Sequence, residues 1–204
     1  MTPLMAVDLD GTLQRSNSLR LFASCSLRDA LRHGRLDRAA RLAGWLALRR
    51  LRLCSHRRMK WAVIGATAIT DSFKSDFVQK AASLVNPRVK DLVDTRRRQG
   101  WHVLLATAAA DIYIPWIWDG PYVATSTADN PQHTECRGPR KLEAVMAYAA
   151  DNGLTLRTAV TDHHDDLALL SAPFVAERIL VNPSPQTLRA VEEAKIAIDT
   201  VLDD

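Results

Sequence analysis

The chain has 204 residues, of which 47% are hydrophobic and 25% charged, and its formal net charge is +4. A chain of this size can bury a sizeable core and fits one globular domain with room for an insertion. Its composition argues against a membrane span, because the longest uncharged apolar-rich run of the basic region covers only residues 42–48, whereas a spanning helix needs about 20 residues.

The N-terminus and the cysteines indicate the compartment. The first ten residues have neither a basic lead nor a long apolar run, so we expect no secretory signal. Cysteines occur far apart and without a CxxC spacing, at positions 25, 54 and 136. This pattern argues against a disulfide framework or a structural zinc site, and we expect a reducing, cytoplasmic location.

The predicted elements fall into three regimes along the chain. Residues 4–9 predict a short buried strand that ends at a Gly-Thr turn, and residues 17–98 show a helical pattern throughout. After Gly100, short apolar strands alternate with helices; we predict strands at 101–107, 121–126, 156–162 and 178–183, and helices near 139–152 and 184–201.

This alternation predicts an α/β fold with a Rossmann-like parallel sheet core covered by helices. The first strand must pair with strands about ninety residues later, so the helical stretch is most simply an all-helical cap insertion. We therefore predict a core domain formed by residues 1–15 and 100–204, and a helical cap domain formed by residues 16–99.

Basic residues are concentrated in the predicted cap. Residues 28–60 carry ten Arg and one Lys against two Asp, a local charge of +9. We favour a solvated helix face, and three alternatives stay open: a lid that attracts an anionic substrate, a peripheral membrane contact, and a nucleic-acid contact. The last is the weakest, because no nucleic-acid motif accompanies the arginines, and we expect no nucleic-acid partner. An apolar stripe through Leu42, Trp45, Leu46 and Leu53 favours packing within the cap over a membrane or partner contact.

Chemically useful side chains follow the predicted strands. Open parallel sheets bind ligands at the carboxyl ends of their strands. Asp8 and Asp10 follow the first strand, and Lys141 opens a helix after Gly138 and Pro139. The other polar residues at strand ends are Thr107, Asp162, Asp165 and Asp166.

Carboxylates gathered at such an edge repel one another unless a cation neutralises them, and a hard ion with oxygen ligands, Mg²⁺, meets that need. Asp8 would then be a nucleophile that forms an aspartyl-phosphate, and Asp10 a general acid and base. Lys141 and Thr107 would hold the phosphoryl group. Taken singly, each has a structural alternative: an Asx-capped turn for the Asp pair, a turn hydroxyl for Thr107 and a solvated first-turn Lys141.

Four motifs resemble those of the haloacid dehalogenase superfamily of aspartate-nucleophile phosphatases, and they occur in the family's order. They read DLDGT at 8–12, HVLLAT at 102–107, RGPRKLEAV at 137–145 and VTDHHDDLALL at 160–170. The position of the helical insertion, between the first and second motifs, is similar to that of the phosphoserine-phosphatase-like branch.

The resemblance implies a Mg²⁺-dependent phosphatase that hydrolyses a small phosphate monoester. Asp8 would be the nucleophile and a metal ligand, Asp10 the acid and base whose carbonyl also binds the metal, and Asp162 a further metal ligand. Asp165 and Asp166 would support the metal shell. Two positions depart from the family pattern: Thr161 stands where Gly is frequent and His163 where a small residue is usual, and both could narrow the crevice or alter metal hydration.

Other functions stay open at this point. The same site permits phosphoryl transfer to another acceptor, or the fold could be a non-catalytic regulatory or lipid-surface module. His163 and His164 beside Asp165 could suggest a transition-metal site, although we favour the oxygen ligands. Substrate choice falls to the cap, and Arg15, Ser16 and Asn17 are the residues that we expect at the crevice mouth. The physiological substrate and the oligomeric state are not predicted.

Overall fold

A computed structural model describes residues 2–128 and 132–203 of the protein. Its residues form two compact units. The first unit contains the described residues 2–15, 85–128 and 134–203, and the second contains 16–84 together with 132–133. Residues 85–99 therefore belong to the first unit, whereas the helical pattern of the sequence predicts a boundary at 99/100.

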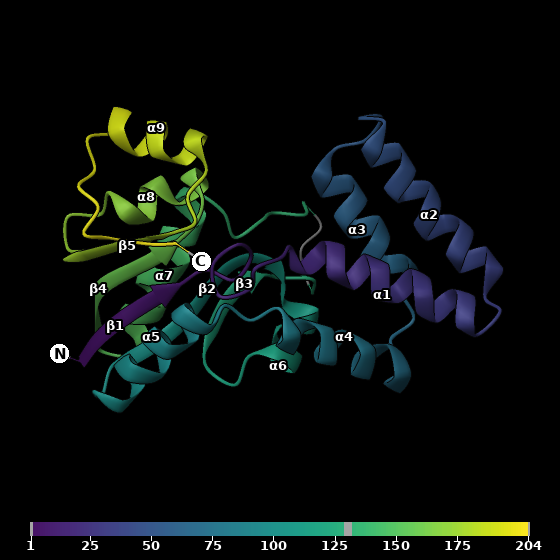
Figure 1. Ribbon diagram of the computed structural model, residues 1–204, viewed down its shortest axis with the longest axis horizontal. Coiled ribbons are helices and arrows are strands. Elements are labelled where there is room, and N and C mark those ends of the chain that lie inside the picture. The colour runs from purple at the N-terminus through teal and green to yellow at the C-terminus, as the bar shows by residue number, and fades with distance from the viewer. Residues whose placement is uncertain (1, 129–131, 204) are drawn as a thin grey trace. The chain divides into compact units, whose positions relative to one another are not determined.

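A six-stranded, wholly parallel sheet forms the centre of the first unit (Figure 1). The strand order is β3-β2-β1-β4-β5-β6, the doubly wound arrangement in which β1 lies at the reversal of strand order. The predicted α/β fold is thus confirmed. The strands are β1 (Thr2–Val7), β2 (His102–Ala110), β3 (Tyr122–Thr125), β4 (Leu154–Thr161), β5 (Glu177–Val181) and β6 (Thr200–Leu202).

The sequence of β1 explains its central place. Leu4, Met5, Ala6 and Val7 are all fully buried, as expected for a strand covered on both faces of a parallel sheet. It pairs with β2 on one side and β4 on the other, with Val7 opposite Leu105 and Val160. The residue after Val7 therefore emerges between two neighbouring strand ends.

Helices cover the sheet. α7 (Pro139–Asp151) begins with Pro139 directly after Gly138, whose φ of 60° favours glycine. Its residues Val145 and Ala149 join Leu4 and Leu156 of the sheet in one core. The remaining helical segments of this unit are α5 (Pro87–Arg98), η1 (Asp111–Tyr113), α6 (Ile114–Ile117), η2 (His164–Asp166), α8 (Leu167–Leu170) and α9 (Pro185–Glu193).

The end of α9 corrects one prediction. The sequence pattern predicts that this helix extends to residue 201, but the helix ends at Glu193 and the chain forms β6. Lys195 adopts a left-handed conformation with φ of 54°, and the Ile196 N–H donates to the Val191 carbonyl across the turn. This is the hydrogen-bond pattern of a Schellman motif, with Lys195 in the left-handed position that glycine usually occupies.

Packing and ion pairs explain why α5 belongs to the first unit. α5 packs against β2, and its residues Val89 and Val93 are buried. A guanidinium nitrogen of Arg96 lies 2.7 Å from a carboxylate oxygen of Glu177 on β5.

The second unit is helical. An edge-to-face contact of Phe22 with Phe73, at a centroid distance of 5.0 Å, lies in its core, and Phe77 packs beside them. Asn17, Ser55 and Thr70 cap three of its helices. No helix among the described residues is long and apolar enough to cross a membrane. The helices are α1 (Ser18–Arg32), α2 (Leu36–Arg50), α3 (His56–Ala66) and α4 (Asp71–Ser83).

Candidate active site

The chain turns sharply at the carboxyl end of β1. The Asp8 N–H still donates to the Val160 carbonyl, at 2.9 Å, so Asp8 is held at the boundary between β1 and β4. Its carbonyl then accepts from Leu13, and the Leu9 carbonyl accepts from Gln14. These bonds fold DLDGT into a compact turn and fix the buried Asp8 side chain at the sheet edge.

Gly11 and Thr12 of this turn lie against Asp162. A Cβ atom added to Gly11 would lie 2.1 Å from the Asp162 Oδ2, and the φ of 83° at Gly11 also favours glycine. The Thr12 hydroxyl donates to the Asp162 Oδ1 at 3.2 Å. Two motifs that lie 150 residues apart in sequence are thus in direct contact.

Lys141 lies between two carboxylates. It shares the buried stripe of α7 with Val145 and Ala149, so the helix aims its ammonium group toward the sheet. Its Nζ donates to the Asp8 Oδ1 at 3.0 Å and to the Asp166 Oδ2 at 2.7 Å. All three side chains are buried, so each charge depends on the others for compensation.

Thr161, the last residue of β4, adds a contact that was not predicted. Its hydroxyl donates to the Asp166 Oδ2 at 2.6 Å. The sequence alone marks Thr161 as a departure that could narrow the crevice, whereas the structure shows it as a hydrogen-bond donor to a buried carboxylate. Its place one residue before Asp162, at the end of a parallel strand, was the available signal.

The carboxylates perturb one another. Burial, together with the nearby Asp166 and Asp162, raises the pKa of Asp8 to about 7, although Lys141 opposes the shift. Burial also raises the pKa of Asp162 to about 6. Burial disfavours the charge of Lys141, but Asp8 and Asp166 outweigh it and raise the pKa of this ammonium. The site therefore has more negative charge than one lysine can balance.

Thr107 and Asp10 complete the set predicted from sequence. The sequence predicts a strand that ends at Thr107, but β2 continues to Ala110, so Thr107 lies buried within it. Its hydroxyl oxygen accepts from the Ala109 N–H at 3.1 Å. A hydroxyl that accepts this bond still has a proton to donate. Asp10 lies in the DLDGT turn and is half-buried.

Asp165 belongs to a second network. It forms an ion pair with Arg137, and its Oδ2 lies 3.0 Å from His163 Nδ1. Burial alone would raise the pKa of Asp165, but Arg137 and the two neighbouring histidines lower it. The structure thus separates the predicted pair, because Asp166 contacts Lys141 whereas Asp165 is held by Arg137. Arg137 was not among the site residues predicted from sequence, although it is the first residue of the third motif and so offered a signal.

The histidine alternative rests on one cluster of side chains. Ligand atoms of His163, His164 and Asp165 lie within 4.8 Å of one another, and they form a candidate metal-ligand group among the described residues. The Arg137 guanidinium already holds the Asp165 carboxylate, and a second cation there would meet its repulsion. We therefore keep the oxygen-ligand interpretation.

The residues predicted at the crevice mouth lie beyond the turn. Arg15 is an exposed residue of the first unit, whereas Ser16 and Asn17 begin the second. The Asn17 side chain accepts the Arg20 N–H at 3.0 Å, so it caps α1. A substrate role for these three residues stays a prediction.

The donor set fits a hard divalent cation. Asp8 and Asp162 offer carboxylate oxygens with raised pKa values, as expected where a balancing cation is needed. The buried Asp166 Oδ1 has no hydrogen-bond partner among the described residues. Asp8, Asp162 and the Asp10 carbonyl could hold Mg²⁺, with Asp166 beside them.

Comparisons with solved structures agree on the fold. This chain is similar to a protein of unknown function from Bordetella pertussis Tohama I, with a TM-score of 0.78 at 18% identity over 100% of this chain and 99% of the other. It is also similar to a phosphoserine phosphohydrolase-like protein from Francisella tularensis subsp. tularensis SCHU S4, with a TM-score of 0.57 at 18% identity over 98% and 94%. A phosphoserine phosphatase structure with a phospho-aspartyl intermediate analogue gives 0.56 at 12% over 98% and 92%.

The doubly wound sheet with acidic side chains at the ends of β1 and β4 defines the class of protein, an α/β enzyme with its site at the switch point of the sheet. The family model of haloacid dehalogenase-like hydrolases matches residues 6–171. The protein therefore belongs to the haloacid dehalogenase-like hydrolase family. Comparison with curated proteins finds no match for this chain.

Proposed function

We propose that the protein is a Mg²⁺-dependent phosphatase that hydrolyses a small phosphate monoester through a covalent aspartyl-phosphate on Asp8. The buried contact of Lys141 with Asp8 and Asp166 is the observation that carries the proposal. A carboxylate at a sheet edge, with a fixed cation beside it, suits attack on a phosphorus atom. The phosphoserine phosphatase with the phospho-aspartyl analogue supports this chemistry in a protein of the same fold.

The proposed reaction has two steps. An Asp8 oxygen attacks phosphorus, the bond to the ester oxygen breaks, and Asp10 gives a proton to the departing alkoxide. Asp10 then takes a proton from a water molecule that attacks the same phosphorus, which releases phosphate and restores the Asp8 carboxylate. Lys141 and the Thr107 hydroxyl offset the charge on the phosphoryl oxygens in both steps.

Bound Mg²⁺ would supply charge neutralisation between the carboxylates and the phosphoryl oxygens. Gly11 keeps room for the Asp162 carboxylate, and Thr12 orients that carboxylate through its hydroxyl. Thr161 and Lys141 together fix Asp166. Contacts within the chain thus orient the carboxylates of Asp162 and Asp166.

The test combines a panel of phosphate esters with Mg²⁺ or EDTA and three variants. We expect phosphate release that EDTA abolishes, loss of turnover in Asp8→Asn, and a large loss in Asp10→Asn. Asp151→Asn, which neutralises an exposed carboxylate at the end of α7, is the matched control and should keep full activity. Full activity of Asp8→Asn would overturn the proposal.

A second measurement examines the intermediate. Acid quench during turnover, followed by mass spectrometry of peptides, should find a phosphoryl group on Asp8, which mild base or hydroxylamine removes. Free phosphate formed without any added acceptor distinguishes hydrolysis from phosphoryl transfer, because water is then the available nucleophile.

We also infer a reducing location such as the cytoplasm. All three cysteines are free, and Cys25 and Cys136 are buried. Burial raises the pKa of the Cys25 thiol to about 11, with Asp76 contributing in the same direction, so this thiol is held in its unreactive form. Quantitative alkylation of all three thiols in the freshly isolated, unfolded protein would support this location, and a native disulfide would contradict it.

A further inference from the structure

The turn between α2 and α3 presents an unusual surface, which we call the α2–α3 surface and define as residues 48–58. All of these residues are exposed except Cys54, which is half-buried. α2 ends in a Schellman motif, because the Leu53 N–H donates to the Leu48 carbonyl at 2.8 Å and the Arg52 N–H donates to the Arg49 carbonyl. This hydrogen bond places the backbones of Leu48 and Leu53 next to each other in the turn.

The leucines of this surface are not packed into the core. Leu51 is 67% exposed, Leu53 69% and Leu48 37%. Of the residues of α2, only Ala39 and Leu42 are buried. The sequence pattern favours packing within the cap for a stripe that includes Leu42 and Leu53; the structure buries Leu42 and exposes Leu53. A cluster of large exposed apolar side chains marks an interaction site.

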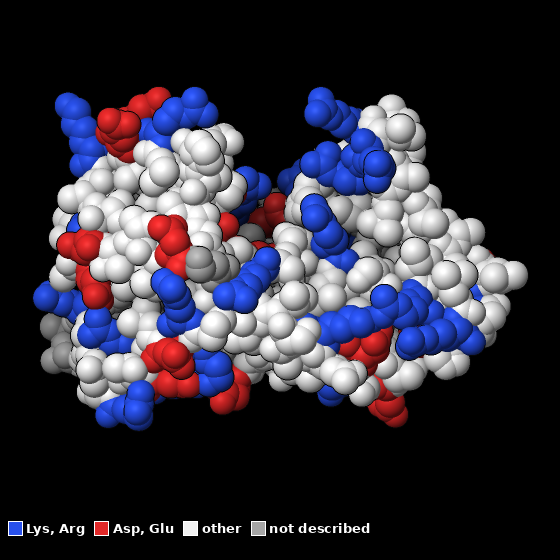
Figure 2. All heavy atoms as spheres, viewed as in Figure 1, with Lys and Arg blue, Asp and Glu red and all other residues white. Residues whose placement is uncertain are grey.

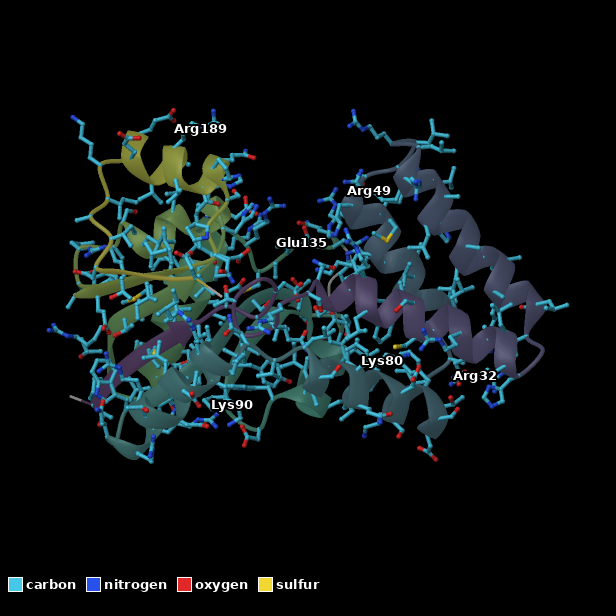
Figure 3. The ribbon with its side chains drawn as sticks, in the orientation of Figure 1. Arg32, Arg49, Lys80, Lys90, Glu135 and Arg189 are labelled. Carbon is cyan, nitrogen blue, oxygen red and sulfur yellow. The ribbon has the colours of Figure 1, made fainter. Side chains whose placement is uncertain are left out.

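Arginines alternate with these leucines along the chain. Arg49, Arg50, Arg52, Arg57 and Arg58 lie on the α2–α3 surface, and residues 38–70 contain no Asp or Glu. Within the part of the chain that the structure describes, no ion pair is formed by Arg49, Arg50, Arg52 or Arg57. Figure 2 shows Lys and Arg side chains gathered where α2 turns into α3, and Figure 3 labels Arg49 there. Among the described residues, the charge of these four arginines is therefore uncompensated.

Arg52 occupies a position that usually belongs to glycine. It follows the C-cap of α2 with a φ of 59°, and a left-handed conformation costs free energy for any residue with a Cβ atom. An arginine here stabilises the turn less than glycine would. A role for the charge at position 52 outside folding would account for this cost.

We propose that the α2–α3 surface docks on anionic phospholipid bilayers, with Leu51 and Leu53 entering the interface and the arginines contacting lipid phosphates. Uncompensated positive charge attracts an anionic membrane surface, and exposed leucines gain free energy when they leave water. A solvated helix face would explain the arginines but not the leucines. A nucleic acid would attract the arginines equally, but it offers no apolar region for the leucines.

Sedimentation with vesicles tests the proposal on the full chain. We expect binding to vesicles of phosphatidylcholine with phosphatidylglycerol, little binding to phosphatidylcholine alone, and weaker binding as salt increases. The variant Arg49→Gln/Arg50→Gln/Arg52→Gln should lower the partition coefficient on the order of one hundredfold. The variant Leu51→Asn/Leu53→Asn should lower it about tenfold or more, with its salt dependence retained.

Arg52→Gly separates binding from folding. Glycine fits the left-handed position, so the melting temperature should stay the same or rise, while vesicle binding falls about fivefold. Arg52→Lys keeps the charge and should keep binding. The matched control is Leu188→Asn/Arg189→Gln, which removes an exposed Leu-Arg pair from α9 of the first unit (Figure 3) and should leave binding unchanged.

Three outcomes would overturn the proposal. One is that the protein binds neutral and anionic vesicles equally, or binds neither kind. Another is binding to duplex DNA or an acidic polymer that the leucine variant retains in full, which would indicate a purely electrostatic partner. The third is a dimer in sedimentation equilibrium that the leucine variant dissociates. Asp8→Asn should bind vesicles like the parent chain, so a failure here and a failure of the proposed phosphatase activity are distinguishable.

Discussion

Gly11 lies so close to Asp162 that the two residues leave no room for a methyl group between them. An added Cβ would lie 2.1 Å from the Asp162 Oδ2 and 2.5 Å from its carboxyl carbon. The contact with Asp162 of the fourth motif thus explains why the first motif has glycine at position 11. The backbone at Gly11 fixes where the Asp162 carboxylate lies, and with it one side of the candidate metal site.

Substitution of Gly11 by Ala should therefore disable the site. The methyl group would displace the Asp162 carboxylate and the positive φ would be strained, which together should cost about 1–3 kcal/mol of stability. We expect phosphatase turnover to fall at least tenfold and the Mg²⁺ requirement to rise. Gly153→Ala is the matched control, because its φ is also positive, at 63°, while nothing lies within 4 Å of the added Cβ. Equal losses in both variants would show that strain, not the contact with Asp162, is responsible.

Lys141 stabilises two buried acids, so its removal should be costly. Lys141→Met leaves Asp8 and Asp166 without their cation, which should destabilise the fold on the order of 3–5 kcal/mol. Urea unfolding and turnover would both be measured, and Arg140→Met, at the exposed neighbouring position, serves as control. Addition of Mg²⁺ should recover part of the lost stability. A variant as stable as the parent would contradict the ion-pair account.

The Thr161 hydroxyl offers a smaller and cleaner test. Thr161→Val keeps the shape of the buried side chain but removes the donor to Asp166 and the weaker acceptor of the His163 N–H, and we expect a loss of about 1–3 kcal/mol. Thr161→Ser restores the hydroxyl and should recover most of that loss. We expect kcat to fall in the Val variant with KM nearly unchanged, because Thr161 acts through Asp166, which contacts Lys141. Identical unfolding curves for Val and Ser variants would refute this role.

The raised pKa of Asp8 predicts how the metal-free protein responds to pH. In the folded state this pKa is about 7, against an ordinary value of 3.8. The folded state thus binds this proton more tightly than the unfolded state, so the contribution of Asp8 to stability is complete below pH 3.8 and is lost as pH rises to about 7. In EDTA, the melting temperature should fall through this window more for the parent chain than for Asp8→Asn.

Mg²⁺ should change that pH response. The ion competes with protons for the same oxygens, so it should raise the melting temperature more at about pH 8 than at about pH 5. Thermal unfolding with Mg²⁺ or EDTA at both pH values makes the comparison. An Mg²⁺ effect that is equal at both, or that Asp8→Asn and Asp162→Asn retain, would argue against a metal site formed by these carboxylates.

The sequence predicted the sheet because its signals are local. The apolar run before Asp8 and the strand-helix alternation after Gly100 each report a buried parallel strand. The order of the motifs then placed Asp8, Asp162 and Asp166 at or just after strand ends and Lys141 at the start of a helix, and the structure brings these side chains together. Their chemical roles stay predictions.

Other features depend on contacts that a linear pattern does not show. The sequence pattern did not predict β6, because the turn that stops α9 has Lys195 in the left-handed position, where glycine is usual. α5 resembles the preceding helices in composition, and its packing against β2 and its ion pair with Glu177 assign it to the first unit. The Thr161 hydroxyl contacts Asp166, and the Arg137 guanidinium contacts Asp165. The sequence does not show which of the two neighbouring acids each group would contact.

The two stems of the helical insertion are joined within the first unit. The Asn86 N–H donates to the Leu13 carbonyl at 2.8 Å, and Gln14 and Val85 form an antiparallel bridge. The insertion thus leaves and rejoins the first unit at two adjacent residue pairs, so its removal need not move Asp8. A chain with a short Gly-Ser link between Arg15 and Val85 should accordingly still fold, bind Mg²⁺ and differ from its parent mainly in which esters it accepts.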